Sequence, residues 1–236
     1  MRSLTLALDA LPGLRDATLS NDVDLAAAAT LAELAGVDAI RLGVNEDLKP
    51  VREEDVCEAR RAARRFELRM PPAQSSIRVA LAARPDSVLL AGEGRDGRSI
   101  SRPLDLRGHG VSVAPVVRSL GEAGIPVSML VAPNIDSVKR AHGEGIIGVE
   151  FFTAGIVDLP VLERSRELER LGDAARMAAK LRLIVGLGGG LGYGTIREVI
   201  QAAPVAERIA VGRAALTRSV LVGLDRALRD LRELVG

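Results

Sequence analysis

The sequence predicts a closed (β/α)8 barrel, and two observations lead to this fold class. Eight short apolar runs are spread at regular intervals along the 236 residues, and most end in a polar or Gly-rich turn followed by a helical stretch. A Gly-rich turn also follows the seventh run, where barrels of this class often bind phosphate. The predicted strands are Leu4–Asp9, Asp38–Val44, Phe66–Met70, Ser87–Gly92, Pro126–Val131, Gly148–Thr153, Leu181–Leu187 and Arg208–Arg213.

An open doubly wound sheet is the alternative fold, because repeated βα units build that fold as well. A dinucleotide-binding sheet of that type carries its glycines in the first βα unit, with an acidic residue about 20 residues later. Here the glycines of Gly186–Gly192 follow the seventh strand instead. One barrel uses about 200 to 250 residues, so we expect a single TIM-barrel domain over residues 1–236.

The first half of the chain alternates predicted strands with short helices. After the first strand we expect a loop, Ala10–Asn21, and Gly36 ends the helix that follows it. Pro71 and Pro72 end the third strand, because proline cannot donate a backbone hydrogen bond. The helices expected in this half are Asp22–Ala35, Glu53–Arg65 and a short one from Ser75 or Ser76 to Ala83.

The longest stretch without a predicted helix or strand is Glu93–Gly110, which is rich in Gly and Arg. A long loop at the catalytic face of a barrel can be a lid, and an ordinary surface insertion is the alternative. The helices expected beyond it are Val111–Ala123, Ile135–His142, Leu159–Lys180 and a final helix that runs to the C-terminus.

The composition is that of an ordinary globular protein, with 47% hydrophobic and 27% charged residues. Aromatic residues make up 2%, so Ala, Val, Leu and Ile must form the core. The net charge of +1, with acids and bases interleaved, excludes the basic field that nucleic-acid binding needs. No apolar run approaches about 18 residues, so we expect no membrane span.

A single cysteine, Cys57, cannot form a disulfide within the chain. This favours a reducing compartment. Met1 leads directly into the first strand without the pattern of a secretory leader. We therefore expect a cytoplasmic protein.

The turns after the seventh and eighth strands carry the strongest local functional signal. Glycines allow backbone N–H groups to converge on an anion, and the following helix N-terminus adds partial positive charge. Arg213 could add a charge-assisted hydrogen bond to phosphate oxygens, whereas the alternative is that these glycines only serve tight turns. The predicted phosphate site of a phosphorylated small molecule comprises Gly188, Gly189, Gly190, Gly212 and Arg213.

Glu150 lies inside the apolar sixth strand, where its side chain must face either the barrel interior or the helix layer. The helix layer would leave it buried and unpaired, which is costly. We therefore place it in the barrel mouth, where a raised pKa would suit acid/base chemistry. A structural ion pair with Arg69 or Arg41 is the alternative. Asp9, which ends the first strand, faces the same mouth, and Arg69 lies near the end of the third strand.

Two further polar residues follow strands at this end of the barrel. Asn45 could reach a ligand, and Glu93 could accept a hydrogen bond from a sugar hydroxyl or an arginine. We interpret His109 as a solvated loop residue and His142 as a structural one. No His, Cys or carboxylate cluster has the spacing of metal ligands, so we expect no metal.

Several segments together resemble the pyridoxine 5'-phosphate synthase family, and the resemblance runs through nearly the whole chain. They are Leu8-Asp9 with Leu14-Arg15, Ala32-Glu33 to Ala35-Gly36 with Asp38, Glu46-Asp47 with Asp55-Val56, Gly121–Val131, Val149-Glu150 with Thr153, Gly188 to Tyr193, Gly212, and Arg218–Leu224. The resemblance implies condensation of 1-deoxy-D-xylulose 5-phosphate with 3-amino-2-oxopropyl phosphate, without a metal or organic cofactor. It also implies a homo-oligomer, usually an octamer in that family.

The catalytic positions of that family are mostly changed here. By resemblance, Asp9, Glu150, Gly190 and Gly212 are retained. The family's catalytic histidines fall on Gly43 and Gly189, and its strand-three glutamate falls on Arg69. The other changed positions are Ala7, Ala10, Thr18, Asn45, Pro50 and Arg213.

Glycine cannot exchange a proton, and arginine is a poor general base at neutral pH. The sequence therefore predicts a divergent enzyme of this synthase type, which acts on a phosphorylated sugar-like or keto substrate. Glu150, Arg69 and Asp9 are its candidate catalytic residues. A true pyridoxine 5'-phosphate synthase with rearranged catalytic groups is one alternative, and a non-catalytic phosphate-ligand binding protein is another.

Overall fold

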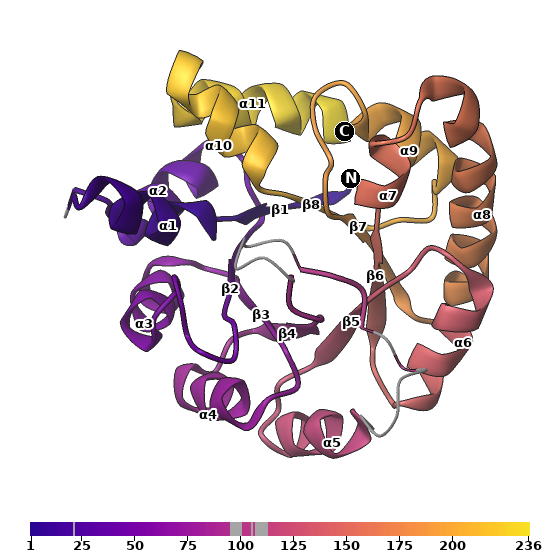
Figure 1. Ribbon diagram of the computed structural model, residues 1–236, viewed down its shortest axis with the longest axis horizontal. Coiled ribbons are helices and arrows are strands. Elements are labelled where there is room, and N and C mark those ends of the chain that lie inside the picture. Colours follow the sequence, from indigo (N-terminus) through magenta and orange to yellow (C-terminus); the bar gives the residue numbers. More distant parts are fainter. Residues whose placement is uncertain (21, 95–100, 105, 107–112) are drawn as a thin grey trace.

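A computed structural model describes residues 1–20, 22–94, 101–104, 106 and 113–236. Its sheet is a closed barrel of parallel strands that pair in sequence order, which confirms the predicted fold class. The last strand pairs with the first, and helices surround the barrel (Figure 1). The strands are β1 (Ser3–Ala7), β2 (Ala39–Gly43), β3 (Phe66–Met70), β4 (Ser87–Leu90), β5 (Val127–Val131), β6 (Gly148–Phe152), β7 (Ile184–Gly188) and β8 (Arg208–Val211).

The helices agree with the predicted order but differ in four places. Two additional helices, Ala154–Val157 and Ile196–Ala202, were not predicted. A helix, α1, occupies most of the expected loop Ala10–Asn21, and the expected final helix is divided at Gly223, whose φ is 81°. The helices are α1 (Ala10–Thr18), α2 (Leu25–Leu34), α3 (Glu53–Ala62), α4 (Gln74–Ala83), α5 (Ala114–Glu122), α6 (Ile135–Gly143), α7 (Ala154–Val157), α8 (Val161–Lys180), α9 (Ile196–Ala202), α10 (Arg213–Val222) and α11 (Leu224–Val235).

Much of the expected loop Glu93–Gly110 lies outside the described residues, and so does His109. The part that is described is attached to the barrel. Gly92 and Arg102 form an antiparallel bridge, and the Leu104 N–H donates to the Leu130 carbonyl at 2.9 Å. The lid therefore stays a prediction.

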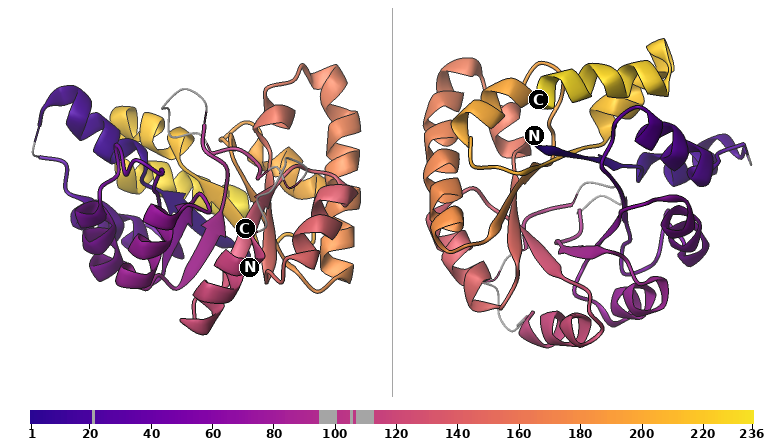
Figure 2. Two further views of the ribbon diagram at one scale, coloured as in Figure 1. Left: turned by 60° about the horizontal axis from the view of Figure 1, so that its bottom comes forward. Right: turned by 180° about the vertical axis from the view of Figure 1, so that it is seen from behind.

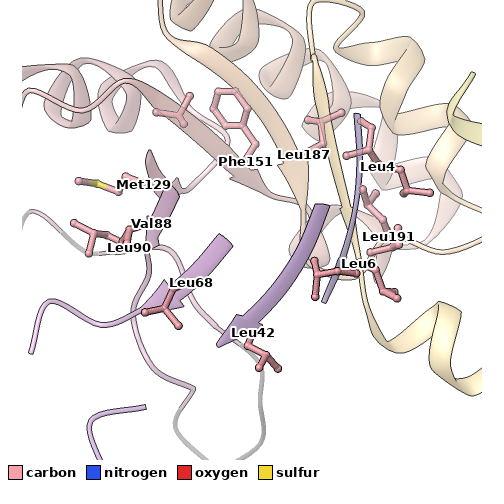
Figure 3. Packing of buried hydrophobic residues seen from close by; sticks show 14 of the residues in the cluster. Leu4, Leu6, Leu42, Leu68, Val88, Leu90, Met129, Phe151, Leu187 and Leu191 are labelled. Atoms are coloured by element: carbon pink, nitrogen blue, oxygen red, sulfur yellow. The ribbon is translucent and has the colours of Figure 1, made fainter. Parts of the chain in front are cut away.

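The main apolar core lies between the strands and the surrounding helices (Figure 3). Successive strand residues point to opposite faces, so every second side chain enters this layer. Leu4, Leu6, Ile40, Leu42 and Phe66 are fully buried there. Aliphatic side chains fill most of it, as the scarcity of aromatic residues predicts.

The alternate strand positions face the barrel interior, and several of them are polar. They include Thr5, Arg41, Glu67, Ser87, Ser128 and Glu150, all of which are buried. Interior positions of such barrels usually carry branched aliphatic residues. The charged interior thus departs from the usual filling of such barrels, and it lies below the mouth where barrel enzymes work.

The two ends of the chain meet at the base of the barrel, and Figure 2 shows them side by side. The Arg2 N–H donates to the Gly236 carbonyl at 3.4 Å. Across the described part of the chain, no helix combines the length and the apolar character needed to cross a membrane.

Candidate active site

A cavity of about 380 Å³ opens at the carboxyl ends of the strands. Its size is at the small end of the range for ligand sites, which suits a small metabolite. The lining has three distinct parts: a charged floor, an apolar side and a rim of glycines. The cavity is lined by Ala7, Asp9, Ala10, Arg41, Arg69, Ser101, Leu130, Glu150, Phe152, Gly189, Gly190, Leu191, Ala210, Val211, Gly212, Arg213, Ala214, Leu216 and Thr217.

Arg41 of β2 forms the centre of the floor, between two carboxylates. Its Nη1 donates to Glu150 Oε1 at 2.9 Å, and its Nη2 donates to Glu150 Oε2. On its other side, Nε donates to Glu67 Oε1 at 2.5 Å. Burial lowers the pKa of the Arg41 guanidinium, but the charges of Glu150 and Glu67 outweigh burial and raise that pKa above its ordinary value.

Glu150 therefore faces the barrel interior, as the sequence predicts, and its ion-pair partner is Arg41. The two-pronged contact fixes the orientation of the carboxylate. Neighbouring β7 leaves room for it, because a Cβ on Gly188 would overlap Glu150 Oε1. Gly188 thus supports the Glu150 side chain and does not line the cavity.

Asp9 and Arg69 form a second ion pair beside the first. Arg69 Nη1 lies 2.9 Å from Asp9 Oδ2, and Asp9 Oδ1 accepts the Gly43 N–H at 2.5 Å. Both side chains line the cavity and are largely buried. The pair brings together the ends of β1, β2 and β3.

The absence of a side chain at Gly43 makes space for Arg69. A Cβ built on Gly43 would overlap the guanidinium group of Arg69. Residues 43 and 69 are also direct neighbours in the register of β2 and β3. Arg69 thus occupies the space that a side chain at position 43 would fill.

The rim of the cavity contains the predicted phosphate loops. Gly189 and Gly190 have φ angles of 79° and 82°, which glycine adopts readily. Thr153 holds this turn, since its hydroxyl donates to the Gly189 carbonyl at 2.5 Å. Gly212 lies across from it and precedes the first turn of α10, where backbone N–H groups lack helical partners.

Arg213 begins α10, is exposed and lines the cavity. Its guanidinium group makes no hydrogen bond or ion pair with another residue that the structure describes, whereas its backbone carbonyl accepts the Thr217 hydroxyl at 2.9 Å. Arg218, farther along α10, stacks 4.7 Å from the ring centroid of Tyr193, whose hydroxyl donates to the Ala227 carbonyl at 2.7 Å. These contacts attach α10 to the loop after β7 and so keep the two halves of the rim together.

Two other predicted site residues do not line the cavity. The Asn45 amide donates to the Lys49 carbonyl at 2.7 Å, and the Glu93 carboxylate accepts the Glu46 N–H. Both side chains thus bind neighbouring loop backbone. His142 is exposed on α6. Within the described ranges, no group of three His, Cys, Asp or Glu side chains could hold a metal ion.

The main feature that sequence reasoning missed is the pairing of Arg41 with Glu67. A signal for it exists, because each of these charged residues lies between two apolar residues inside a predicted strand. Such residues are almost never fully buried unless they are paired. Ser101, Leu130 and Phe152 were also not predicted to line the site, and no local pattern singles them out.

Comparisons with known proteins agree with this architecture. The family model described as "Pyridoxal phosphate biosynthesis protein PdxJ" matches residues 4–236. Curated proteins named pyridoxine 5'-phosphate synthase from Desulfosudis oleivorans and Geobacter metallireducens are each 34% identical to this chain over 237 residues. The matches cover 100% of this chain and 100% and 99% of those relatives.

Two solved structures with a similar fold share little sequence with this chain. A tryptophan synthase from Mycobacterium tuberculosis has a TM-score of 0.67 at 18% identity, over 99% of this chain and 92% of that one. A thiamine phosphate pyrophosphorylase from Pyrococcus furiosus has a TM-score of 0.61 at 18% identity, over 99% and 95%. These likenesses show the barrel fold alone.

Proposed function

Because this chain belongs to the pyridoxal phosphate biosynthesis protein PdxJ family, we propose that it is a divergent enzyme of that family. Its curated relatives are named as synthases, which supports an enzyme of vitamin B6 biosynthesis. The more specific part of the proposal concerns the substrate. We assign it a phosphorylated sugar-like or keto compound, bound in the cavity above Arg41 and Glu150.

The observation that carries this proposal is the placement of Arg213 beside the two glycine turns. Gly189, Gly190 and Gly212 line the same cavity as Arg213 and the start of α10. A helix N-terminus and an unpaired arginine both favour a phosphate group. The phosphate would anchor the ligand at the rim and direct the rest of it toward Asp9, Arg69 and Glu150.

The proposed chemical roles follow from the two ion pairs. Glu150 is the acid/base group, and Arg41 controls its orientation. Arg69 is an electrostatic partner for the ligand group that faces it, and Asp9 orients Arg69. Loss of one positioned acid/base group typically costs a factor of about 10²–10⁴, so a reaction that depends on imidazoles would be slow here.

Binding of phosphorylated probes to purified protein tests the proposal. We expect glycerol 3-phosphate and inorganic phosphate to raise the melting temperature and to bind in calorimetry. Arg213→Gln should weaken the binding of both probes by about tenfold, because one charge-assisted hydrogen bond is lost. Arg226→Gln is the matched control, since Arg226 pairs with Asp230 on α11 away from the cavity. Absence of phosphate binding to the wild-type protein would overturn the proposal.

A true pyridoxine 5'-phosphate synthase is the second candidate, and full-length identity to proteins of that name favours it. Complementation of a pyridoxine-requiring strain that lacks the synthase separates the two. Growth rescue by the wild-type chain, lost in Glu150→Gln, would support this candidate. Failure of rescue, with the protein present and folded, would support the divergent enzyme.

A non-catalytic binding protein is the third candidate, and the ion pair between Glu150 and Arg41 favours it. In that case, Glu150→Gln would leave ligand affinity unchanged, and no candidate substrate would be turned over.

We further propose a homo-oligomer that works in the cytoplasm. The single exposed Cys57 is compatible with a reducing compartment.

A further inference from the structure

Arg69 has hydrogen-bonding capacity that the described protein residues do not use. A guanidinium group has five N–H donors and remains charged at any physiological pH. Its ion pair with Asp9 engages Nη1, and no other described residue forms an ion pair or hydrogen bond with it. The side chain is only 12% exposed, so bulk water covers little of it.

The cavity wall offers Arg69 no further carboxylate. Asp9 and Glu150 are the acidic residues among the described lining residues. Both are already engaged, Asp9 by Arg69 and the Gly43 N–H, and Glu150 by Arg41. The side chains around them are mostly apolar, namely Ala7, Ala10, Leu130, Phe152 and Ala210.

We propose that Arg69 binds a carboxylate of the ligand, so that the substrate is a short phosphorylated sugar acid or keto acid. This inference rests on the proposed function, in which the β7 and β8 turns hold the phosphate. Asp9 already neutralises part of the charge of Arg69. A singly charged carboxylate therefore fits better than a second, doubly charged phosphate.

The same arrangement disfavours a ligand with an amine at this end. Arg69 has no acceptor atom and would repel an ammonium group. Both carboxylate oxygens of Asp9, which could attract one, already contact the Gly43 N–H and Arg69. Residue 69 thus determines which group is accepted opposite the phosphate.

Three phosphorylated probes of equal chain length test this assignment by calorimetry. They are 3-phosphoglycerate, glycerol 3-phosphate and 3-aminopropyl phosphate, which end in a carboxylate, an alcohol and an amine. Inorganic phosphate reports on the rim alone. Wild-type protein should bind 3-phosphoglycerate at least about tenfold more tightly than glycerol 3-phosphate, because a hydrogen-bonded charge pair is added. The amine should bind most weakly.

Variants at position 69 should change this order without changing the affinity for inorganic phosphate. Arg69→Gln should remove the preference for the carboxylate, and Arg69→Glu should favour the amine. Asp9→Asn combined with Arg69→Gln avoids an unpaired buried carboxylate and should show the same loss of preference in a well-folded protein. Arg78→Gln, on exposed α4, should behave as wild type.

Equal affinity of the wild-type protein for the carboxylate and the alcohol would overturn this inference. So would an equal loss for all three probes in Arg69→Gln. In both cases phosphate binding remains, so the proposed function stands. If neither the probes nor inorganic phosphate bind at all, the proposed function and this inference both fall.

Discussion

Arg41 is the residue on which the interior of the barrel depends. It lies between Glu67 and Glu150, and all three side chains are nearly excluded from water. A buried ion pair repays its desolvation cost only when its geometry is good and its remaining atoms are bonded. Here the Ser87 hydroxyl adds a contact to Glu67 Oε2 at 3.3 Å. The arginine is therefore a structural requirement of this site as well as a part of it.

Replacement of Arg41 by methionine should destabilise the protein strongly. Two buried carboxylates would lose their cation, and removal of one partner of a buried pair costs about 3–5 kcal/mol. Equilibrium unfolding in urea measures the change. The triple variant Arg41→Met, Glu67→Gln, Glu150→Gln should recover part of this loss, because it removes the buried charges as well. A loss below about 1 kcal/mol in the single variant would contradict the proposed role.

Gly43→Ala should change ligand preference more than stability. The added Cβ would overlap the Arg69 guanidinium, which can move because it is the end of a flexible side chain. Arg69 would shift from Asp9, and the preference for 3-phosphoglycerate over glycerol 3-phosphate should fall several-fold. Calorimetry checks this. Gly121→Ala is the matched control, because an added Cβ there meets nothing within 4 Å. Equal results for the two variants would refute the coupling of residues 43 and 69.

At this scale, sequence reasoning identified Glu150, Asp9 and Arg69 but not Glu67, and it left the ion-pair partner of Glu150 open. The apolar strand around Glu150 sufficed to predict that its side chain faces the interior. The choice between Arg41 and Arg69 needed the closed barrel, since Arg41 and Glu150 are 109 positions apart and come from strands that do not pair. Such contacts depend on which strand positions the closed barrel brings together in its interior.

At the scale of elements, α1 shows where local signals misled the prediction. Pro12 and Gly13 suggest a loop, yet proline is tolerated in the first turn of a helix. Arg15 of α1 binds Asp55 at the start of α3, with Nη1 to Oδ1 at 2.6 Å and Nη2 to Oδ2 at 3.3 Å. This long-range pair, which a local pattern cannot reveal, attaches α1 to the rest of the barrel.

Asp55→Ala should therefore destabilise the protein by about 2–3 kcal/mol. The buried carboxylate accepts the Arg52 backbone N–H and the guanidinium N–H groups of Arg15. The substitution therefore removes both a helix cap and a charged hydrogen bond. Urea unfolding measures the effect. Asp225→Ala removes an exposed pair with Arg229 within α11 and should have little effect by comparison. Similar losses for the two variants would show that the Arg15–Asp55 contact contributes no more than a surface pair.

At the scale of the whole molecule, apolar side chains are exposed at a few places on the outer helices. Val220 and Leu221 at the end of α10 are 83% and 84% exposed, and Leu34 on α2 is 67% exposed. The two elements that carry them, α10 and α2, both pack against α11. Figure 1 shows these helices together on one side of the barrel. Exposed apolar side chains such as the adjacent Val220 and Leu221 are candidates for a protein interface.

The barrel itself was predictable because each βα unit carries its own local pattern, and closure follows once eight such units are present. The chain end was less predictable. Gly223 divides the expected final helix, and the separate α10 and α11 bring Val220 and Leu221 to the surface. Apolar periodicity cannot distinguish a side chain that faces the core from one that faces a second subunit.

The homo-oligomer that we propose should depend on this surface of α10. The wild-type chain should have a molar mass in solution several times 24.9 kDa, measured by light scattering after size exclusion. Val220→Lys with Leu221→Lys should reduce that mass, because burial of charges in an apolar interface is costly. Both side chains are exposed in the single chain, so the fold should persist, with unchanged circular dichroism. Val161→Lys with Leu162→Lys places charges on another exposed apolar site, at the start of α8. If the α8 variant dissociates and the α10 variant does not, the interface lies at the start of α8 and not at α10. A monomeric wild-type chain would refute the oligomer.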